Sequence, residues 1–339
     1  MTDTEIECRS LWKIYGSRAE EAFKAVRENG LGKDEVRDQF DCVLGVRDVS
    51  FTISKGEIFC IMGLSGSGKS TLVRHINRLI EPTAGKVYVS GQQVDSMGEK
   101  ELRQLRAETI GMVFQHMALW PHRTLADNVG FGLEVRGVPQ DKRRAASEQA
   151  LESMDLKGWE DHYPDQLSGG MQQRVGLARA LAADPEILLM DEPFSALDPL
   201  IRRQLQDQFL ALSQRVKKTT VFITHDLDEA IRMGDRIAIM NDGVIVQTGT
   251  PEEIVTNPKD DYVAEFVQGI SRVNLVRAKT IMTPLDGREV TNKTVNLDSY
   301  LGEVIDQFMT EHSPVTALNQ DGVAVGQITI TDALRALRG

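Results

Sequence analysis

Residues 63–70 read Gly63-Leu64-Ser65-Gly66-Ser67-Gly68-Lys69-Ser70. A mostly apolar run over residues 57–62 precedes this stretch, and a helix-compatible run over residues 71–79 follows it. The stretch therefore lies at a strand-to-helix turn, which is the setting that a phosphate-binding loop requires. Its glycines allow backbone N–H groups to turn inward and bind phosphate oxygens at the positive end of the next helix. We expect a nucleotide site here.

The residue types of this phosphate loop each predict a contact with the nucleotide. Lys69 would reach the β and γ phosphates, and the Ser70 hydroxyl would coordinate Mg²⁺. The other residues expected to bind the nucleotide at this turn are Gly63, Ser65, Gly66, Ser67, Gly68 and Thr71. A glycine-rich loop that matches by chance is the alternative, and the strand and helix on either side argue against it.

A second apolar run ends in two carboxylates. It reads Glu186-Ile187-Leu188-Leu189-Met190-Asp191-Glu192, which predicts a strand buried on both faces with its polar end at the carboxyl edge of a parallel sheet. Asp191 would hold the Mg²⁺ shell, directly or through water, and Glu192 would polarise an attacking water. The alternative, that two acids merely end a strand, is weakened because they occur together with a phosphate loop.

Further motifs follow in a fixed order. The most specific is Leu167-Ser168-Gly169-Gly170-Met171-Gln172-Gln173-Arg174, and the others are Lys13-Ile14-Tyr15-Gly16, Val113-Phe114-Gln115, Ser195-Ala196-Leu197-Asp198 and Ile223-Thr224-His225-Asp226. Together with the phosphate loop and the acidic strand end, this order resembles the ATP-binding subunit of an ABC transporter. The resemblance runs from about Ile6 to Gly269. Simpler P-loop enzymes lack the signature at residues 167–174.

The resemblance implies a role for each of these motifs. Tyr15 would stack on adenine, Gln115 would contact Mg²⁺ or water, and His225 would be the switch histidine. Asp198 lies in the segment that resembles the D-loop. Taken alone, a tyrosine or histidine in such a place is more often a packing or capping residue, and a lone glutamine says little. Only the order of these residues along the chain, relative to the other motifs, favours a role for them in the nucleotide site.

The resemblance also implies that one chain holds half of each site. In the family, the signature loop of one subunit caps the γ-phosphate bound to the phosphate loop of the other, so two ATP molecules lie within a head-to-tail dimer. Ser168, Gly169 and Gly170 suit that role because they offer a hydroxyl and unhindered backbone donors ahead of a helix. ATP binding would close the dimer, and hydrolysis by Glu192 would release it.

Composition narrows the classes of partner. The chain has 339 residues, of which 41% are hydrophobic and 26% charged, so a large globular domain and a small one are expected. The net charge of −11 argues against nucleic acid as a main partner. Cys8, Cys42 and Cys60 have no metal-ligand spacing and are interpreted as reduced cytosolic thiols.

Because no apolar run approaches 18 residues and no leader is evident, we expect a soluble subunit with separate membrane partners.

The segment after Gln115 is a candidate contact with those partners. It reads His116-Met117-Ala118-Leu119-Trp120-Pro121-His122. In importers of this family, the corresponding segment helps to form a groove for a short helix of the membrane permease subunit. The alternative is that Met117 and Trp120 are core residues of a helical subdomain. The resemblance thus implies a homodimer bound to permease subunits, indirectly served by a substrate-binding protein, at the cytoplasmic face of the bacterial inner membrane.

An insertion indicates the subfamily. Residues 17–41 form an extra charged segment with Ala22, Phe23 and Val26 at helical spacing, whereas most ABC ATPases pass directly from the adenine tyrosine into the next strand. With the phosphate loop and the run Asn77-Arg78-Leu79-Ile80-Glu81-Pro82-Thr83, it resembles the glycine betaine/proline importers of quaternary amines, which include choline and carnitine systems. The implied function is the ATPase motor of such an importer. The carried solute would be selected by the binding protein and the membrane subunit rather than by this chain.

The C-terminal region resembles a single CBS module. Residues 278–339 predict an amphipathic helix at 300–311 and strands at 315–318 and 323–330, with Gly326-Gln327-Ile328-Thr329-Ile330-Thr331-Asp332 as the closing motif. In that family, Thr329 and Asp332 would match positions that contact ligand phosphate or ribose. The module would regulate its host, for example by sensing ionic strength, or would only dimerise with the copy on the other subunit.

The fold expected is α/β: a mostly parallel sheet with the phosphate loop and Asp191 at its carboxyl edge, and an antiparallel β layer carrying Tyr15. We assign residues 1–270 to the ATPase domain, with a helical subdomain at 116–180, and residues 278–339 to the CBS-like module. The rivals are an importer ATPase for another small solute, a soluble ABC ATPase of DNA repair or translation, and a P-loop enzyme unrelated to transport. ABC ATPases of DNA repair have a long coiled coil between the phosphate loop and the signature, and those of translation have two ATP sites in one chain. This sequence shows no sustained heptads and one ATP site. P-loop enzymes unrelated to transport lack the signature that this sequence carries.

Overall fold

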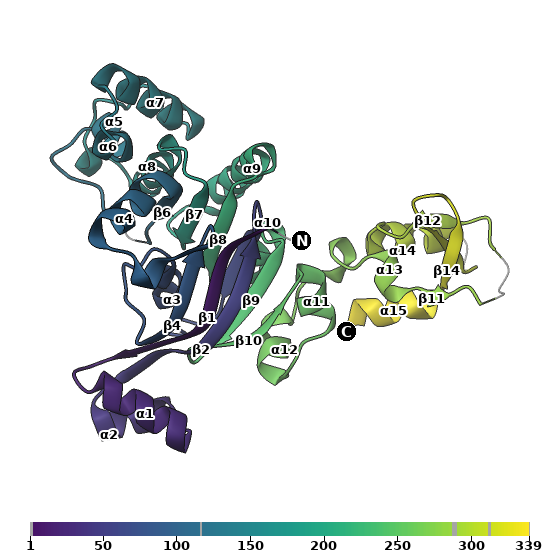
Figure 1. Ribbon diagram of the computed structural model, residues 1–339. Coiled ribbons are helices and arrows are strands. Elements are labelled where there is room, and N and C mark those ends of the chain that lie inside the picture. Colours follow the sequence, from purple (N-terminus) through teal and green to yellow (C-terminus); the bar gives the residue numbers. More distant parts are fainter. Residues whose placement is uncertain (1–2, 116, 287–289, 311–312, 339) are drawn as a thin grey trace. The chain divides into compact units, whose positions relative to one another are not determined.

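The computed structural model describes residues 3–115, 117–286, 290–310 and 313–338 (Figure 1). The chain divides into two compact units, Met1–Thr248 and Gly249–Gly339. The break therefore falls before residue 270, where the sequence placed the end of the first domain. One reason is that Glu252 Oε1 accepts a hydrogen bond of 2.8 Å from Arg277 N, and Val255 O accepts one of 2.9 Å from Arg272.

The first unit is built on a six-stranded sheet of order β10-β9-β3-β8-β7-β6. Its strands are β3 (Ile58–Met62), β6 (Ile110–Val113), β7 (Ile187–Asp191), β8 (Thr219–Thr224), β9 (Arg236–Asn241) and β10 (Val244–Gly249). The pairings of β3 with β8 and β9, and of β7 with β6 and β8, are parallel. Every residue of β3 and β7 is buried, as expected for strands covered on both faces. The predicted parallel core is confirmed.

An antiparallel sheet of order β2-β1-β4-β5 packs against this core. Its strands are β1 (Thr4–Tyr15), β2 (Val43–Ser54), β4 (Ala84–Val89) and β5 (Gln92–Gln93). Phe51 of β2 stacks on Phe59 of β3 with ring centroids 5.3 Å apart, and helix α3 (Lys69–Ile76) buries Leu72 and Ile76 in the same core. The β layer therefore holds Tyr15, the last residue of β1, beside the phosphate loop.

Helices form the rest of the first unit. The four that gather beside β6 in Figure 1 are α5 (Leu125–Val129), α6 (Phe131–Val135), α7 (Gln140–Ser153) and α8 (Gly169–Ala182). Further helices of this unit are α4 (Glu99–Gln104), a π-helical turn (Leu105–Thr109), α9 (Pro199–Val216) and α10 (Leu227–Met233). The first four largely coincide with the helical segment expected at 116–180, of which His116 lies outside the described residues. No helix in the described ranges is long and apolar enough to cross a membrane.

The insertion folds as a pair of helices, α1 (Ala19–Asn29) and α2 (Lys33–Phe40), between β1 and β2. Its apolar side packs on the end of the β layer: Ala22, Val26 and Val36 are buried, and the Phe23 ring meets Trp12 edge-on at 5.4 Å. The break between the helices lies at Gly30, which has a φ of +70° and ends α1 in a left-handed cap. Packing on β1 and β2 thus fixes a charged segment in place.

The second unit has a sheet of order β11-β14-β13-β12. Its elements are α11 (Pro251–Thr256), α12 (Asp261–Val267), α13 (Ala278–Ile281), β11 (Thr283–Pro284), β12 (Thr294–Asn296), α14 (Leu301–Thr310), β13 (Val315–Leu318), β14 (Ala324–Ile328) and α15 (Ile330–Arg338). The core joins Leu301, Val304 and Phe308 of α14 to Val315 and Ile328 of the sheet. The predicted helix and two strands are present, although Glu311 lies outside the described residues.

Candidate functional site

The phosphate loop leaves β3 and enters α3 in a shape that requires glycine at two positions. Gly63 and Gly68 have φ angles of +152° and +101°. A Cβ atom added at Gly63 would lie 2.1 Å from Met240 O, and one at Gly68 would lie 2.2 Å from Gly45 O. Backbone of the two neighbouring strands therefore packs directly against the loop. The loop's curvature is set by β2 and β9 as well as by its own sequence.

Lys69 lies at the start of α3, almost completely buried. Its ammonium donates hydrogen bonds of 2.8 Å to Gly63 O and 2.9 Å to Leu64 O. Burial lowers the pKa of Lys69, while the nearby carboxylates of Glu192 and Asp191 act in the opposite direction. The loop carbonyls thus hold the cation at the place where phosphate oxygens are expected.

Ser70 and Asp191 supply two oxygen ligands suited to Mg²⁺. The Ser70 hydroxyl donates a hydrogen bond of 2.8 Å to Asp191 Oδ1, and Arg74 lies 3.2 Å from Asp191 Oδ2. No group of three or more His, Cys, Asp or Glu side chains that could hold a metal occurs in the described part of the chain. Mg²⁺ commonly takes only one or two protein oxygens and completes its shell with water and substrate phosphates. The Ser70 hydroxyl and the Asp191 carboxylate could provide these one or two protein oxygens for Mg²⁺.

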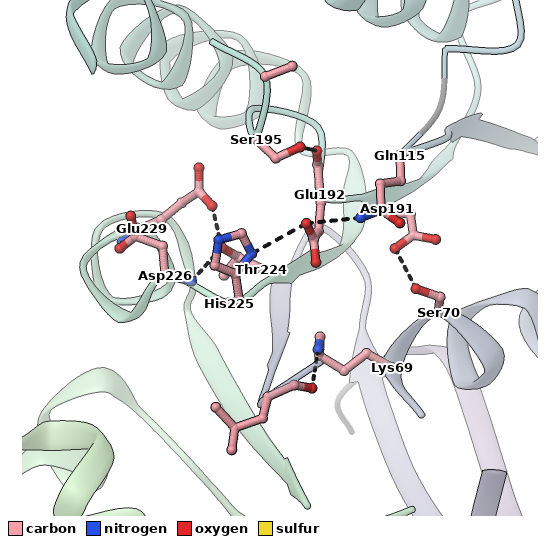
Figure 2. Close-up of polar contacts among 12 residues, drawn as sticks. Lys69, Ser70, Gln115, Asp191, Glu192, Ser195, Thr224, His225, Asp226 and Glu229 are labelled. Atoms are coloured by element: carbon pink, nitrogen blue, oxygen red, sulfur yellow. Dashed lines mark hydrogen bonds and ion pairs between the residues drawn. The ribbon is translucent and has the colours of Figure 1, made fainter. Parts of the chain in front are cut away.

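Glu192 brings two further predicted residues together. Its Oε2 accepts a hydrogen bond of 3.2 Å from Gln115 Nε2 and lies 3.3 Å from His225 Nδ1 (Figure 2). The Glu192 side chain is 17% exposed and that of His225 is 61% exposed. The backbone of Glu192 has a φ of +49°, which is uncommon for a residue other than glycine. The left-handed conformation at the end of β7 directs the carboxylate toward the residues after β6 and β8.

The backbone of Glu192 is held by Gln173 and Ser195, for which the sequence predicted no individual role. Its carbonyl accepts hydrogen bonds of 3.3 Å from Gln173 Nε2 and 3.0 Å from the Ser195 hydroxyl. Gln173 also accepts a bond of 3.1 Å from Ala196 N, and its side chain is fully buried on α8. Gln173 stood within the signature, but nothing in the local sequence indicated a bond to the end of β7.

A buried polar cluster supports the loop that carries His225. The Thr224 hydroxyl donates to the carboxylate of Glu229 and accepts a bond of 3.0 Å from Asp226 N. Gln206 of α9 donates a bond of 2.7 Å to the other oxygen of Glu229. Burial raises the pKa of Glu229, with the two hydrogen bonds acting against it. Glu229 was missed because its only local signal is a place in the first turn of α10.

A cavity of about 420 Å³ collects most of the predicted nucleotide contacts. The predicted residues that line it are Tyr15, Ser65, Gly66, Gly68, Lys69, Ser70, Thr71, Gln115 and Glu192. The Tyr15 hydroxyl lies 3.0 Å from that of Thr71, which ties the end of β1 to the start of α3. Lys33, Val43, Leu44 and Gly45 also line the cavity, and the sequence had not indicated them. The cavity therefore runs from an aromatic ring to a phosphate loop.

The signature and the D-loop residue lie elsewhere. Ser168 caps α8 by accepting a bond of 3.3 Å from Met171 N, and Asp198 caps α9 by accepting one of 3.1 Å from Ile201 N. Neither residue, nor Gly169 or Gly170, is among the described residues that line the cavity of their own chain. The phosphate loop and the signature are thus separate surfaces within one chain.

Thr329 and Asp332, in the second unit, bind each other. Asp332 Oδ2 accepts bonds of 2.9 Å from Thr329 N and 2.7 Å from its hydroxyl, while the Thr329 hydroxyl accepts one of 3.2 Å from Asp332 N. This reciprocal pattern is that of a helix N-cap, and it starts α15. The cap accounts for the spacing of the two residues without a ligand.

Known proteins match this arrangement over most of the chain. The family described as ABC transporter matches residues 46–195. The glycine betaine/proline betaine transport system ATP-binding protein ProV of Escherichia coli is 52% identical over 277 residues, 82% of this chain and 69% of its own. The trimethylamine N-oxide transport system ATP-binding protein TmoW of Pelagibacter ubique is 42% identical over 329 residues, 97% of this chain and 96% of its own.

The chain belongs to the ATP-binding proteins of ABC transporters. A solved dimer of the ATP-binding cassette MJ0796, in a post-hydrolysis state with ADP and Pi, has a TM-score of 0.63 at 32% identity. It covers 73% of this chain and 98% of its own. This ABC ATPase accordingly binds ATP, with Mg²⁺ as its metal partner.

Replacing Gly68 tests whether the neighbouring strand sets the loop shape. In Gly68→Ala the new Cβ meets Gly45 O, so we expect strain of about 1–3 kcal/mol and a Kd for ATP raised at least about tenfold. Gly91→Ala is the control, because Gly91 has a φ of +76° but no heavy atom within 4 Å of an added Cβ. Titration calorimetry measures the Kd for ATP of both variants, and equal ATP affinity in the two would show that contact with Gly45 does not set the loop shape.

The buried position of Glu229 predicts a pH effect on stability. Because the folded-state pKa lies above the ordinary value of 4.5, the contribution of Glu229 is fully present below that pH and is lost as the pH rises through the raised pKa. The free energy of unfolding of the wild type, relative to Glu229→Gln, should therefore fall over that window. Denaturant unfolding across pH measures it, with the exposed Glu28→Gln as control. A difference that stays constant with pH would count against the raised pKa.

Proposed function

We propose that this chain is the ATP-hydrolysing subunit of a binding-protein-dependent importer of a quaternary amine or a related compatible solute. The observation that carries the proposal is the Glu192 carboxylate, which Gln115 and His225 hold beside a phosphate loop. The substrate class is supported by relatives named for glycine betaine, proline betaine and trimethylamine N-oxide transport. Of three relatives named for choline or carnitine transport, one, named for glycine betaine and carnitine, is 50% identical to this chain. The other two are 41% and 39% identical.

Each residue of the site has a separate role in ATP binding and hydrolysis. Glu192 accepts a proton from the attacking water, while Gln115 and His225 orient its carboxylate. Lys69 and the loop N–H groups bind the β and γ phosphates, and Tyr15 packs against adenine. Ser70 and Asp191 hold Mg²⁺, which when bound offsets the negative charge of the phosphates. Each role uses an atom that the fold already holds in place.

Two copies of the chain complete the site. Ser168, Gly169, Gly170 and Asp198 lie outside their own chain's cavity, so they are available to bind the γ-phosphate on a second copy. The dimeric form of the MJ0796 cassette supports this arrangement. ATP bound between the two copies gains contacts only when they close, which couples nucleotide binding to movement.

An apolar groove supports a contact with the permease subunits. It encloses about 480 Å³ and is lined by Met112, Phe114, Ala118, Trp120, Phe131 and Val135, among others. Trp120 packs on Phe131 with centroids 4.1 Å apart, and Arg179 lies 5.7 Å above the Trp120 ring. A short apolar helix of a membrane protein fits such a groove. The chain would then work peripherally at the cytoplasmic face of the bacterial inner membrane, served indirectly by a substrate-binding protein.

We propose that residues 1–270 form the ATPase domain, which would extend past the compact unit that ends at Thr248, and that residues 278–339 form a CBS-like module. The four-stranded sheet with α14 and α15 supports a separately packed module. We propose that it pairs with the copy on the other subunit and regulates the ATPase, for example in response to ionic strength. Because Thr329 and Asp332 cap α15, a ligand there would have to replace hydrogen bonds that they already make.

Exchanging one carboxylate tests the catalytic role. Glu192→Gln keeps the size of the side chain but cannot accept the proton, so we expect ATP hydrolysis to fall at least about a hundredfold with ATP binding retained. Glu186→Gln is the matched control, because Glu186 is exposed and precedes the same strand. Phosphate release and ATP affinity measure the two steps. Hydrolysis at the wild-type rate in Glu192→Gln would overturn the assignment.

A further inference from the structure

The inserted helices reach the nucleotide cavity through one cation. Lys33 is the first residue of α2 and lines the same cavity as Tyr15, Gly66 and Lys69. Residues 43–45 of β2 also line this cavity, and Val43 pairs with Tyr15. An ATPase that passed directly from Tyr15 into β2 would have no side chain at this place.

The Lys33 ammonium is anchored next to the phosphate loop. It lies 3.3 Å from Asp242 Oδ1, in the turn between β9 and β10. The next residue, Gly243, donates a hydrogen bond of 3.0 Å to Ser67 O of the loop and accepts one of 2.8 Å from Arg47 N of β2. The turn is thus fixed to the loop and to the β layer. Asp242 consequently draws the Lys33 ammonium toward the turn that is bonded to the loop.

The ion pair itself is weak enough to be exchanged. The side chains of Lys33 and Asp242 are 41% and 71% exposed, and ion pairs in such settings contribute little. A bound triphosphate carries several negative charges and is a stronger partner for an ammonium than one solvated carboxylate. Lys69 is held deeper, by loop carbonyls. Lys33 is therefore a second cation on the cavity wall, nearer to the surface.

The cavity indicates which part of the nucleotide Lys33 meets. Lys69 marks the end for the β and γ phosphates, and Tyr15 marks the end for the base. The Tyr15 and Thr71 hydroxyls lie 3.0 Å apart, so the base end of the cavity adjoins the start of α3. The turn that holds the Lys33 ammonium is bonded to the phosphate loop through Gly243 and Ser67 O. We propose that Lys33 is a nucleotide-binding residue supplied by the inserted helices, and that its ammonium binds the ribose–phosphate portion of ATP and ADP. This inference rests on the proposed nucleotide site.

The insertion does not depend on Lys33 for its packing. Val36 of α2 is fully buried in the apolar cluster that also contains Trp12 and Leu44, and this cluster fixes the helices on the β layer. Replacing Lys33 should leave the unfolding temperature without nucleotide unchanged. An effect on ATP affinity would then report contact with the ligand.

The test measures the Kd of ATP and ADP, with Mg²⁺, by calorimetry on the full chain at low salt. Lys33→Ala should raise both constants about three- to tenfold, and Lys33→Arg should restore them. Asp242→Asn releases Lys33 from its ion pair and should leave ATP affinity unchanged or increase it. Lys24→Ala is the matched control, since Lys24 is an exposed cation of α1 in the same insertion.

Two outcomes would overturn the inference. In the first, Lys33→Ala binds ATP as tightly as Lys24→Ala. In the second, Asp242→Asn weakens ATP binding as much as Lys33→Ala does, which would mean that Lys33 only holds the insertion to the turn. Lys69→Ala separates this inference from the nucleotide site itself. Loss of binding in Lys69→Ala with no effect in Lys33→Ala rejects Lys33 alone, whereas wild-type affinity in Lys69→Ala rejects the site and the inference together.

Discussion

The position of Glu192 is the constraint on which the nucleotide site depends. Its N–H donates a bond of 3.1 Å to Ile223 O at the end of β8, its carbonyl is held by Gln173 of α8, and its carboxylate meets Gln115 and His225. The sheet, the signature helix and the loops after β6 and β8 therefore meet at one residue. A shift of α8 against the sheet cannot occur without changing the surroundings of the carboxylate.

This arrangement follows from how a parallel sheet is buried. Strands β3 and β7 are covered on both faces, so polar side chains can lie only where the strands end. Both strands end at the same edge, which places the loop after β3 beside Asp191 and Glu192. The buried charges there have partners: Lys69 on loop carbonyls, and Asp191 on Ser70 and Arg74. The energetic cost of burying charge is offset by hydrogen bonds within the site.

The sequence predicted the features that are encoded locally. The phosphate loop, the strand that ends at Asp191 and the β layer that carries Tyr15 can each be recognised from a few adjacent residues. The contacts that hold the site together could not, because they join distant segments: Gln206 to Glu229, Gln173 to Glu192, and Lys33 to Asp242 across 209 positions. The spacing of Thr329 and Asp332 has two physical explanations, a ligand site and a helix cap, and local sequence does not distinguish them.

We propose that ATP hydrolysis at Glu192 drives the import of a quaternary amine. Uptake of radiolabelled glycine betaine, choline, carnitine and trimethylamine N-oxide tests it most directly, in cells that express this chain or its Glu192→Gln form with the neighbouring permease and binding-protein subunits. We expect uptake of at least one of these amines with the wild-type chain and none with Glu192→Gln. Equal uptake with both chains, or no uptake of any amine with the wild type, would show that Glu192 does not drive such transport.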